Sequence, residues 1–340
     1  MQIEGPKSMR YSIIVCTHNP DDRIFSRCLS AIAVLRRENI WFEVLLVDNN
    51  SLVPLSDRDY VISFLEDVAE SKLIHIPQQG LVMARAGGIR EAKGEFLVFF
   101  DDDNEPSVEY IIELDKLSKL FPHVGAWGPG NITVDFIDGV NPSDENSYRQ
   151  IFQERHSSFI EYAMIREWQS CYPFGTGLCI KKTLAAKYIE RVVSGELTLI
   201  GRSGEKMSSG DDTQMVLQAI TMGYAAGISP QMSVLHIIPA KKLDFRYLKR
   251  LAFGTSSCSF LFPLEVLPEY KSKIEQLRPI TPSKLYTKVL RQYFKLRLKP
   301  DNLKTLDFIE YVGWLYSYYI ATEQKIPDVI KWVIKKMNVS

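Results

Sequence analysis

Short apolar runs alternate with stretches of helical periodicity through the first 130 residues, and this alternation restricts the fold more than any other feature. Strands are expected over 11–16, 42–47, 73–76 and 96–100, with helices over 20–37, 57–69 and 81–92. The strand segments are continuous apolar runs, which is typical of parallel strands buried on both faces. The alternation predicts an α/β fold with a mostly parallel, doubly wound central sheet flanked by helices.

Three of the expected strands end in polar clusters. The clusters are Thr17-His18-Asn19, Asp48-Asn49-Asn50-Ser51 and Asp101-Asp102-Asp103. The carboxyl ends of parallel strands meet at one edge of a sheet, and open α/β sheets bind their ligands at that edge. We therefore expect the three clusters to form a single binding edge.

The aspartate triplet carries the strongest chemical signal. Three adjacent carboxylates repel one another unless a cation lies among them. Mg²⁺ and Mn²⁺ prefer oxygen ligands, often one or two carboxylates together with substrate phosphates. The triplet therefore predicts a divalent-metal site that receives a phosphorylated ligand. The alternative is an acidic turn that caps a helix beginning near Ser107.

Two further candidates lie in the second half of the chain. Asp211 and Asp212 stand in the first turn of a helix expected over 211–222. A carboxylate there can act as a general base if it reaches the nucleophilic hydroxyl, whereas the alternative is an ordinary helix cap. His236, near the end of an expected strand, is either a metal ligand or a hydrogen-bonded structural residue.

A glycine-led helix supplies another candidate. Gly80 precedes the helix and lets the backbone approach a ligand, while Arg85 can pair with phosphate or carboxylate. The alternative is a plain N-cap glycine with a surface arginine. No G-x-G-x-x-G follows the first strand and no P-loop motif occurs, which argues against dinucleotide-binding dehydrogenases and P-loop enzymes.

The pattern changes after Val124. We expect short strands up to about Asp135, a helix over 148–168, strands over 178–181 and 233–238, and a mobile, polar loop over 199–210. Beyond Pro239 the sequence is helical, basic and aromatic. We therefore expect two domains, one over 1–240 and a helical, basic C-terminal region over 241–340.

The two expected domains differ in charge. The C-terminal region has 19 basic and 9 acidic residues, and the first 240 residues have 22 basic and 32 acidic. The segment 284–299 has the pattern of a basic amphipathic helix, which suits an anionic membrane surface. The alternative is that the C-terminal helices pack on the first domain through an aromatic stripe. We expect no nucleic-acid partner.

The expected location is the cytoplasm, with peripheral contact to the inner face of the cell membrane. The five cysteines form no C-x-x-C pair, which fits a reducing cytosol. The first ten residues contain no apolar segment of a signal peptide. No apolar run reaches the roughly 18 residues of a membrane-spanning helix.

Taken together, these segments resemble the family 2 glycosyltransferases, which have the GT-A fold. The resemblance spans about Tyr11 to Gly254. The matching segments occur in order at 12–20, 44–51, 80–85, 101–103, 175–177, 201–204, 209–212 and 236–239. The family usually has Glu where this chain has Asp211, and often has Asn where this chain has Ala86.

The resemblance implies a role for each candidate residue. On the donor side it implies that nucleotide-sugar contacts come from Thr17, Asn19, Asp48, Ser51, Gly80, Arg85, Asp101 and Asp102. Asp103 would bind Mn²⁺ or Mg²⁺, with His236 as a second ligand of the metal or diphosphate. Asp212 would be the catalytic base, beside Asp211.

The reaction implied by the resemblance is inverting transfer of a sugar from a UDP-linked donor. The acceptor would be the hydroxyl of a saccharide or lipid-linked saccharide, in bacterial polysaccharide or glycolipid biosynthesis. The alternatives are a sugar-nucleotide nucleotidyltransferase and a catalytically inactive GT-A scaffold. Nucleotidyltransferases usually carry a Gly-rich basic loop after the first strand, and here that loop is acidic and lacks glycine.

Overall fold

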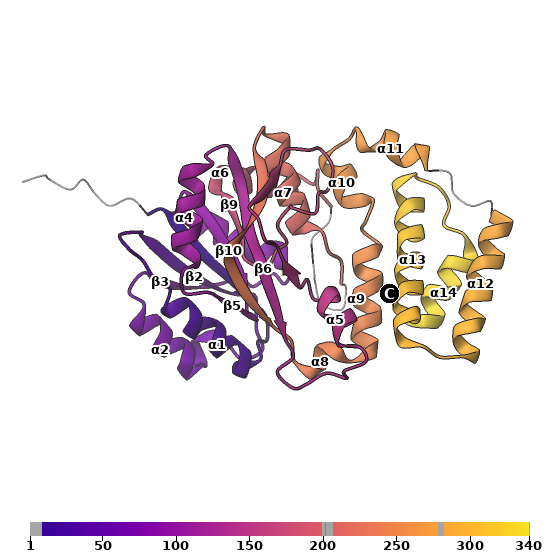
Figure 1. Cartoon of the computed structure of the whole chain (residues 1–340), viewed down its shortest axis with the longest axis horizontal. Helices are drawn as coiled ribbons and strands as arrows, with labels where there is room; N and C mark the ends of the chain where they lie inside the picture. The colour runs from indigo at the N-terminus through magenta and orange to yellow at the C-terminus, as the bar shows by residue number, and fades with distance from the viewer. Residues whose placement is uncertain (1–8, 199–200, 202–206, 278–281, 340) are drawn as a thin grey trace, which may run out of the picture.

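Four parallel strands and three connecting helices build the N-terminal half of a central sheet (Figure 1). The computed structural model describes residues 9–198, 201, 207–277 and 282–339. The elements, in order, are β1 (Tyr11–Thr17), α1 (Asp22–Ala33), β2 (Phe42–Asp48), the 3₁₀ helix η1 (Leu55–Asp57), α2 (Asp59–Asp67), β3 (Ser71–His75), α3 (Leu81–Glu91) and β4 (Phe96–Asp101). The predicted alternation of strands and helices is confirmed, with ends that differ by a few residues.

Six further strands extend the same sheet. The elements that follow are β5 (Asn104–Pro106), α4 (Tyr110–Leu120), β6 (Val124–Asp135), α5 (Glu145–Ile151), β7 (Arg155–His156), β8 (Glu161–Ala163), β9 (Leu178–Lys181), α6 (Lys182–Val193), α7 (Asp211–Thr221) and β10 (Ala225–Ile237). The strand order is β3-β2-β1-β4-β9-β6-β10-β5, with β7 beside β6 and β8 beside β10. Most paired residues lie in parallel ladders, as expected.

The strand register explains why the polar clusters meet. Thr17 lies opposite Asp48 in the β1–β2 ladder, and Cys16 lies opposite Asp101 in the β1–β4 ladder. The ends of three parallel strands therefore stand side by side. The prediction that the three clusters lie at one edge of the sheet is confirmed.

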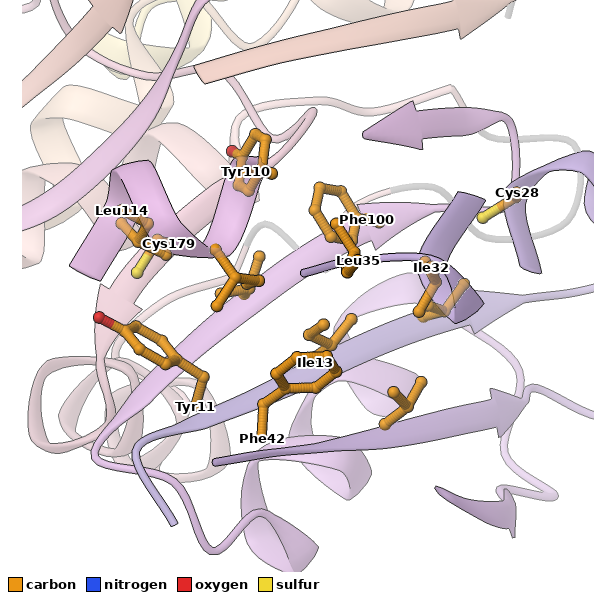
Figure 2. Close-up of a cluster of buried hydrophobic side chains, with 14 of the residues drawn as sticks. Tyr11, Ile13, Cys28, Ile32, Leu35, Phe42, Phe100, Tyr110, Leu114 and Cys179 are labelled. Atoms are coloured by element: carbon orange, nitrogen blue, oxygen red, sulfur yellow. The ribbon is translucent and has the colours of Figure 1, made fainter. Parts of the chain in front are cut away.

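Both faces of the sheet are buried. In β1, Ile13 packs with residues of α1, α2 and α4, whereas its neighbour Ile14 packs with residues of α3, α6 and α7. Figure 2 shows the first of these clusters, in which Phe42 and Phe100 lie on the same side as Ile13. Burial on two faces is the reason that the strands are continuous apolar runs rather than alternating ones.

The expected helix over 148–168 is wrong. The chain forms only α5 there and then turns into β7 and β8, which pair with β6 and β10. Gly227 of β10 allows the close approach of β8, because a Cβ atom at this position would lie 2.4 Å from the carbonyl oxygen of Glu161. Tertiary pairing therefore overrides the local helical spacing. Similarly, the short strands expected up to Asp135 are one continuous strand, β6.

Helices follow β10, as expected. They are α8 (Ala240–Leu243), α9 (Phe245–Ser256), α10 (Leu261–Val266), α11 (Tyr270–Gln276), α12 (Pro282–Leu298), α13 (Asn302–Ala321) and α14 (Asp328–Met337). α9 lies between the sheet and α13, and α12 and α14 form the outer layer (Figure 1). The aromatic stripe lies on α13 and consists of Phe308, Tyr311 and Tyr319. Phe308 and Tyr319 are buried in a cluster that also contains Val134, Phe152 and Ile238, and Tyr311 packs against it. The C-terminal helices therefore share a hydrophobic core with the end of the sheet.

Candidate active site

A cavity of about 670 Å³ opens at the predicted binding edge. Its walls come from the ends of β1, β2 and β4, the starts of α3 and α7, and the C-terminal helices α9 and α13. The cavity-lining residues include nine of the twelve predicted site residues, which are Thr17, Gly80, Arg85, Asp101, Asp102, Asp103, Asp211, Asp212 and His236. Residues far apart in the sequence therefore meet in one cavity.

The three carboxylates of the triplet have different partners. Asp102 accepts a hydrogen bond from the hydroxyl of Thr17, and burial, followed by the charge of Asp103, raises the pKa of Asp102 to about 6. The side chain of Asp101 is 39% exposed, and its Oδ1 lies 3.8 Å from Nη2 of Arg85. Asp103 is buried. The triplet is thus divided between separate interactions and does not cap the next helix, α4, whose N-cap is Glu109.

Asp103 and His236 are brought together by the short β5–β10 ladder. His236 lies opposite Asn104, and the amide of Ile237 donates to the carbonyl oxygen of Asp103 over 2.8 Å. Nε2 of His236 lies 3.5 Å from Oδ2 of Asp103. The carbonyl oxygen of Phe152 accepts from Nδ1 over 2.9 Å. The backbone therefore fixes the ring so that Nε2 faces the carboxylate.

A divalent cation fits this pair of residues. A histidine whose other nitrogen donates to a carbonyl oxygen is the usual arrangement of a metal ligand. The ammonium group of Lys242 contacts the same Oδ2, so a positive group already lies beside Asp103. Although burial raises the pKa of Asp103, Lys242 and His236 outweigh it and lower the pKa well below its usual range. Within the described residues no cluster of three or more metal-ligating side chains occurs. Donor phosphates and water would therefore complete the coordination.

Asp211 and Asp212 begin α7 but have different surroundings. Oδ2 of Asp211 forms a buried ion pair with Nη1 of Arg85. Asp212 instead accepts from the backbone amides of Gly175 and Thr213, each over 2.8 Å. Burial, followed by the charge of Asp211, raises the pKa of Asp212. Of the two carboxylates, Asp212 is therefore the one without a cationic side chain hydrogen-bonded to it.

Three predicted donor-binding residues lie outside the cavity lining. The two carboxylate oxygens of Asp48 accept from the amides of Ser51 (2.9 Å) and Leu55 (3.1 Å). Oδ1 of Asn19 accepts from the amide of Leu52 over 2.8 Å, and the hydroxyl of Ser51 accepts from the amide of Asn19 over 3.0 Å. In this structure these side chains hold the loops after β1 and β2, and their contact with a donor stays a prediction.

Two residues of the cavity were missed by the sequence analysis. Oδ1 of Asn49 accepts from the amide of Gly80 over 2.8 Å, which fixes the start of α3 against the end of β2. Lys242 reaches Asp103 from α8. Asn49 belongs to the polar cluster that follows the second strand. The sequence marks Lys242 only as one residue of a basic segment. Residues 202–206, part of the loop expected to be mobile, lie outside the described residues.

Comparisons with known proteins agree with the fold. Residues 12–176 match the family model "Glycosyl transferase family 2". Glycosyltransferase AglE of Haloferax volcanii is 24% identical over 246 residues, covering 72% of this chain and 71% of AglE. The mannosyltransferase PcManGT of Pyrobaculum calidifontis, solved in complex with GDP-Man and Mn²⁺, is 17% identical with a TM-score of 0.50, covering 93% of this chain and 86% of PcManGT. S. aureus TarS 1-349 is 14% identical with a TM-score of 0.47, covering 96% and 83%. At this identity the likeness to PcManGT concerns the fold, which is the expected one.

The buried Arg85–Asp211 pair makes a prediction about stability. We expect Arg85→Met to lower the free energy of unfolding by about 3–5 kcal/mol, because it leaves the buried Asp211 carboxylate without its partner. Urea unfolding measures the change. The double variant Arg85→Met/Asp211→Leu should recover much of the loss, and Arg90→Met, on the exposed side of the same helix, is the matched control. Equal effects of Arg85→Met and Arg90→Met would contradict the prediction.

Proposed function

Because the chain is a family 2 glycosyltransferase, we propose that it transfers a sugar from a nucleoside diphosphate sugar to an acceptor hydroxyl within the cavity described above. One observation carries the proposal. The cavity brings the acidic triplet after β4, the imidazole of His236 and the carboxylate of Asp212 together from three distant parts of the chain. These are the groups needed to bind a charged donor and to accept the proton of the nucleophile.

The donor would lie along the strand ends. Its nucleoside would contact the wall formed by Thr17, Asn49 and Gly80, and its diphosphate would lie near Asp103 and His236. These two side chains would hold Mn²⁺ or Mg²⁺, which neutralises charge on the leaving diphosphate when bound. We propose a UDP-linked donor. The relative PcManGT was solved with GDP-Man and Mn²⁺, so GDP-linked sugars are the natural comparison.

Asp212 would act as the general base. Its two backbone hydrogen bonds fix the orientation of the carboxylate at the cavity. The acceptor hydroxyl gives its proton to Asp212 while its oxygen forms the bond to the anomeric carbon. The bond from that carbon to the diphosphate oxygen breaks, and the nucleoside diphosphate leaves. Attack from the face opposite the leaving group inverts the anomeric configuration. Asp211 would position Arg85 rather than take the proton.

The outer face of α12 suits an anionic membrane surface. The buried residues Leu285, Val289, Tyr293 and Leu296 turn one side of this helix toward the protein core. The other side exposes a basic row of Lys284, Lys288, Arg291 and Lys295, with Phe294 and Leu298 exposed beside it. A basic face with apolar neighbours fits lipid headgroups. We propose that this contact brings a lipid-linked saccharide acceptor to the enzyme, at the inner face of a bacterial cell membrane.

No helix among the described residues is both long and apolar enough to cross a membrane. Because the exposed face of α12 is basic, the proposed membrane contact would be largely electrostatic and would weaken as salt screens the charges.

We expect Asp212→Asn to reduce transfer about 10²–10⁴-fold, because the amide cannot accept the proton of the acceptor. Binding of the nucleotide should be unchanged. Sugar transfer is measured as the nucleotide released from a panel of UDP- and GDP-sugars with Mn²⁺. Nucleotide binding is measured by calorimetric titration with UDP and GDP. Asp67→Asn, an exposed aspartate at the end of α2, is the control. Near-normal turnover of Asp212→Asn would remove Asp212 as the base.

The raised pKa of Asp212 predicts the pH dependence of the reaction. A general base works only when it is deprotonated, so kcat/KM should fall as the pH is lowered through this pKa. Because burial and Asp211 raise the pKa, the fall should begin at a higher pH than for an ordinary aspartate. The measurement is kcat/KM against pH. A profile that stays flat down to the ordinary aspartate range would contradict the prediction.

Membrane contact is tested by flotation with vesicles. We expect binding to vesicles that contain phosphatidylglycerol and not to phosphatidylcholine alone, with loss at high salt. Lys288→Gln/Arg291→Gln/Lys295→Gln should weaken binding by about 3 kcal/mol, at about 1 kcal/mol for each charge. The control is a triple Lys→Gln variant of the first domain at Lys72, Lys119 and Lys187. If the control weakens binding equally, the surface of α12 is not the contact.

A further inference from the structure

Lys242 has a position that the family motifs do not account for. Its ammonium group pairs with Oδ2 of Asp103, the same oxygen that lies 3.5 Å from Nε2 of His236. The Lys242 side chain is 21% exposed and that of Asp103 is 8% exposed, so the pair lies at the cavity wall, open to it on the lysine side.

The local structure directs Lys242 into the cavity. β10 ends at Ile237, and α8 begins after Pro239 with the amide of Ala240 donating to Asp138 over 3.0 Å. Asp244 caps the next helix, α9, by accepting from the amides of Arg246 and Tyr247. The short helix is thus fixed at both ends. Its four-residue length carries Lys242 back toward β5.

The neighbouring lysine points elsewhere. Nζ of Lys241 lies 4.0 Å from Oδ2 of Asp21, and its side chain is 61% exposed. Lys241 does not line the cavity, whereas Lys242 does. Two adjacent residues of equal charge therefore have different surroundings, which makes Lys241 a matched comparison for Lys242.

The charges of the cavity indicate which anions Lys242 can pair with. Arg85, the other cation among the acidic residues, is buried and paired with Asp211. A lysine carries its charge on a flexible stem with three donors, so it can exchange one anionic partner for another. Oδ1 of Asp103 accepts from Nδ2 of Asn104 over 2.9 Å, so Oδ2, which Lys242 contacts and His236 faces, is the oxygen left for a divalent metal. The lysine and the metal therefore compete for one oxygen.

We propose that Lys242 is a tethered cation that neutralises Asp103 before the metal binds and pairs with the donor diphosphate once the metal has taken its place. This inference rests on the proposed function, because it assumes a nucleoside diphosphate donor. It makes Lys242 a ligand of the leaving group. It also predicts that metal binds weakly in the absence of donor and more tightly once the diphosphate draws Lys242 away.

The test uses Lys242→Met in two titrations of the full chain. Without nucleotide, Mn²⁺ should bind about tenfold more tightly to the variant than to the wild type, since one charge-assisted hydrogen bond no longer competes. In saturating Mn²⁺, UDP and GDP should bind about tenfold more weakly to the variant, because a diphosphate ligand is lost. Uridine and guanosine, which lack phosphates, should bind both proteins equally. Free Mn²⁺ is followed by its electron paramagnetic resonance signal, and nucleotide binding by calorimetry.

Opposite changes in the two titrations separate this role from a structural one. A merely structural lysine would weaken both affinities or neither, and either result would overturn the proposal. Lys242→Arg keeps the charge and should retain nucleotide binding in saturating Mn²⁺, and Lys241→Met should leave both titrations unchanged. Thermal unfolding confirms that each variant is folded. If the wild type binds neither UDP nor GDP, the proposed function fails together with the diphosphate role, while the Mn²⁺ titration still decides the competition at Asp103.

Discussion

The short ladder between β5 and β10 is the constraint on which the rest of the cavity depends. It ties the turn after β4 to the end of the last strand, so that Asp103 and His236 face each other although 133 positions separate them. The same strand end sets where α8 begins and therefore where Lys242 points. One stretch of backbone hydrogen bonds thus positions the imidazole, the carboxylate and the ammonium group together.

Two ion pairs divide the negative charge of the cavity. Arg85 balances Asp211 from the glycine-led helix, and Lys242 balances Asp103 from the C-terminal side. The first pair is buried, whereas the second is partly open to the cavity. Asp212 accepts instead from the backbone amides of Gly175 and Thr213 and from the hydroxyl of Thr213. Because the two cations are paired with Asp211 and Asp103, the carboxylate of Asp212 remains able to accept a proton.

Much of the fold was predictable because each central strand is a short apolar run that both layers of helices cover. The helix over 148–168 was not, since β8 is extended by its pairing with β10, which local spacing does not record. Of the site, Asp101 to Asp103, Arg85, Asp212 and His236 were predictable from motifs that stand at strand and helix ends. Lys242 was not, because its approach to Asp103 depends on the turn between β10 and α9.

The hydrophobic core shared by the sheet and the C-terminal helices couples the unfolding of these helices to the order of the cavity. Phe152 packs in that core, and its carbonyl oxygen holds the ring of His236. Loosening of α9 or α13 would therefore be transmitted to the imidazole through a single residue. Local unfolding of the C-terminal layer and loss of the ordered cavity should be one cooperative event, so that the helical region is a structural part of the enzyme rather than a detachable anchor.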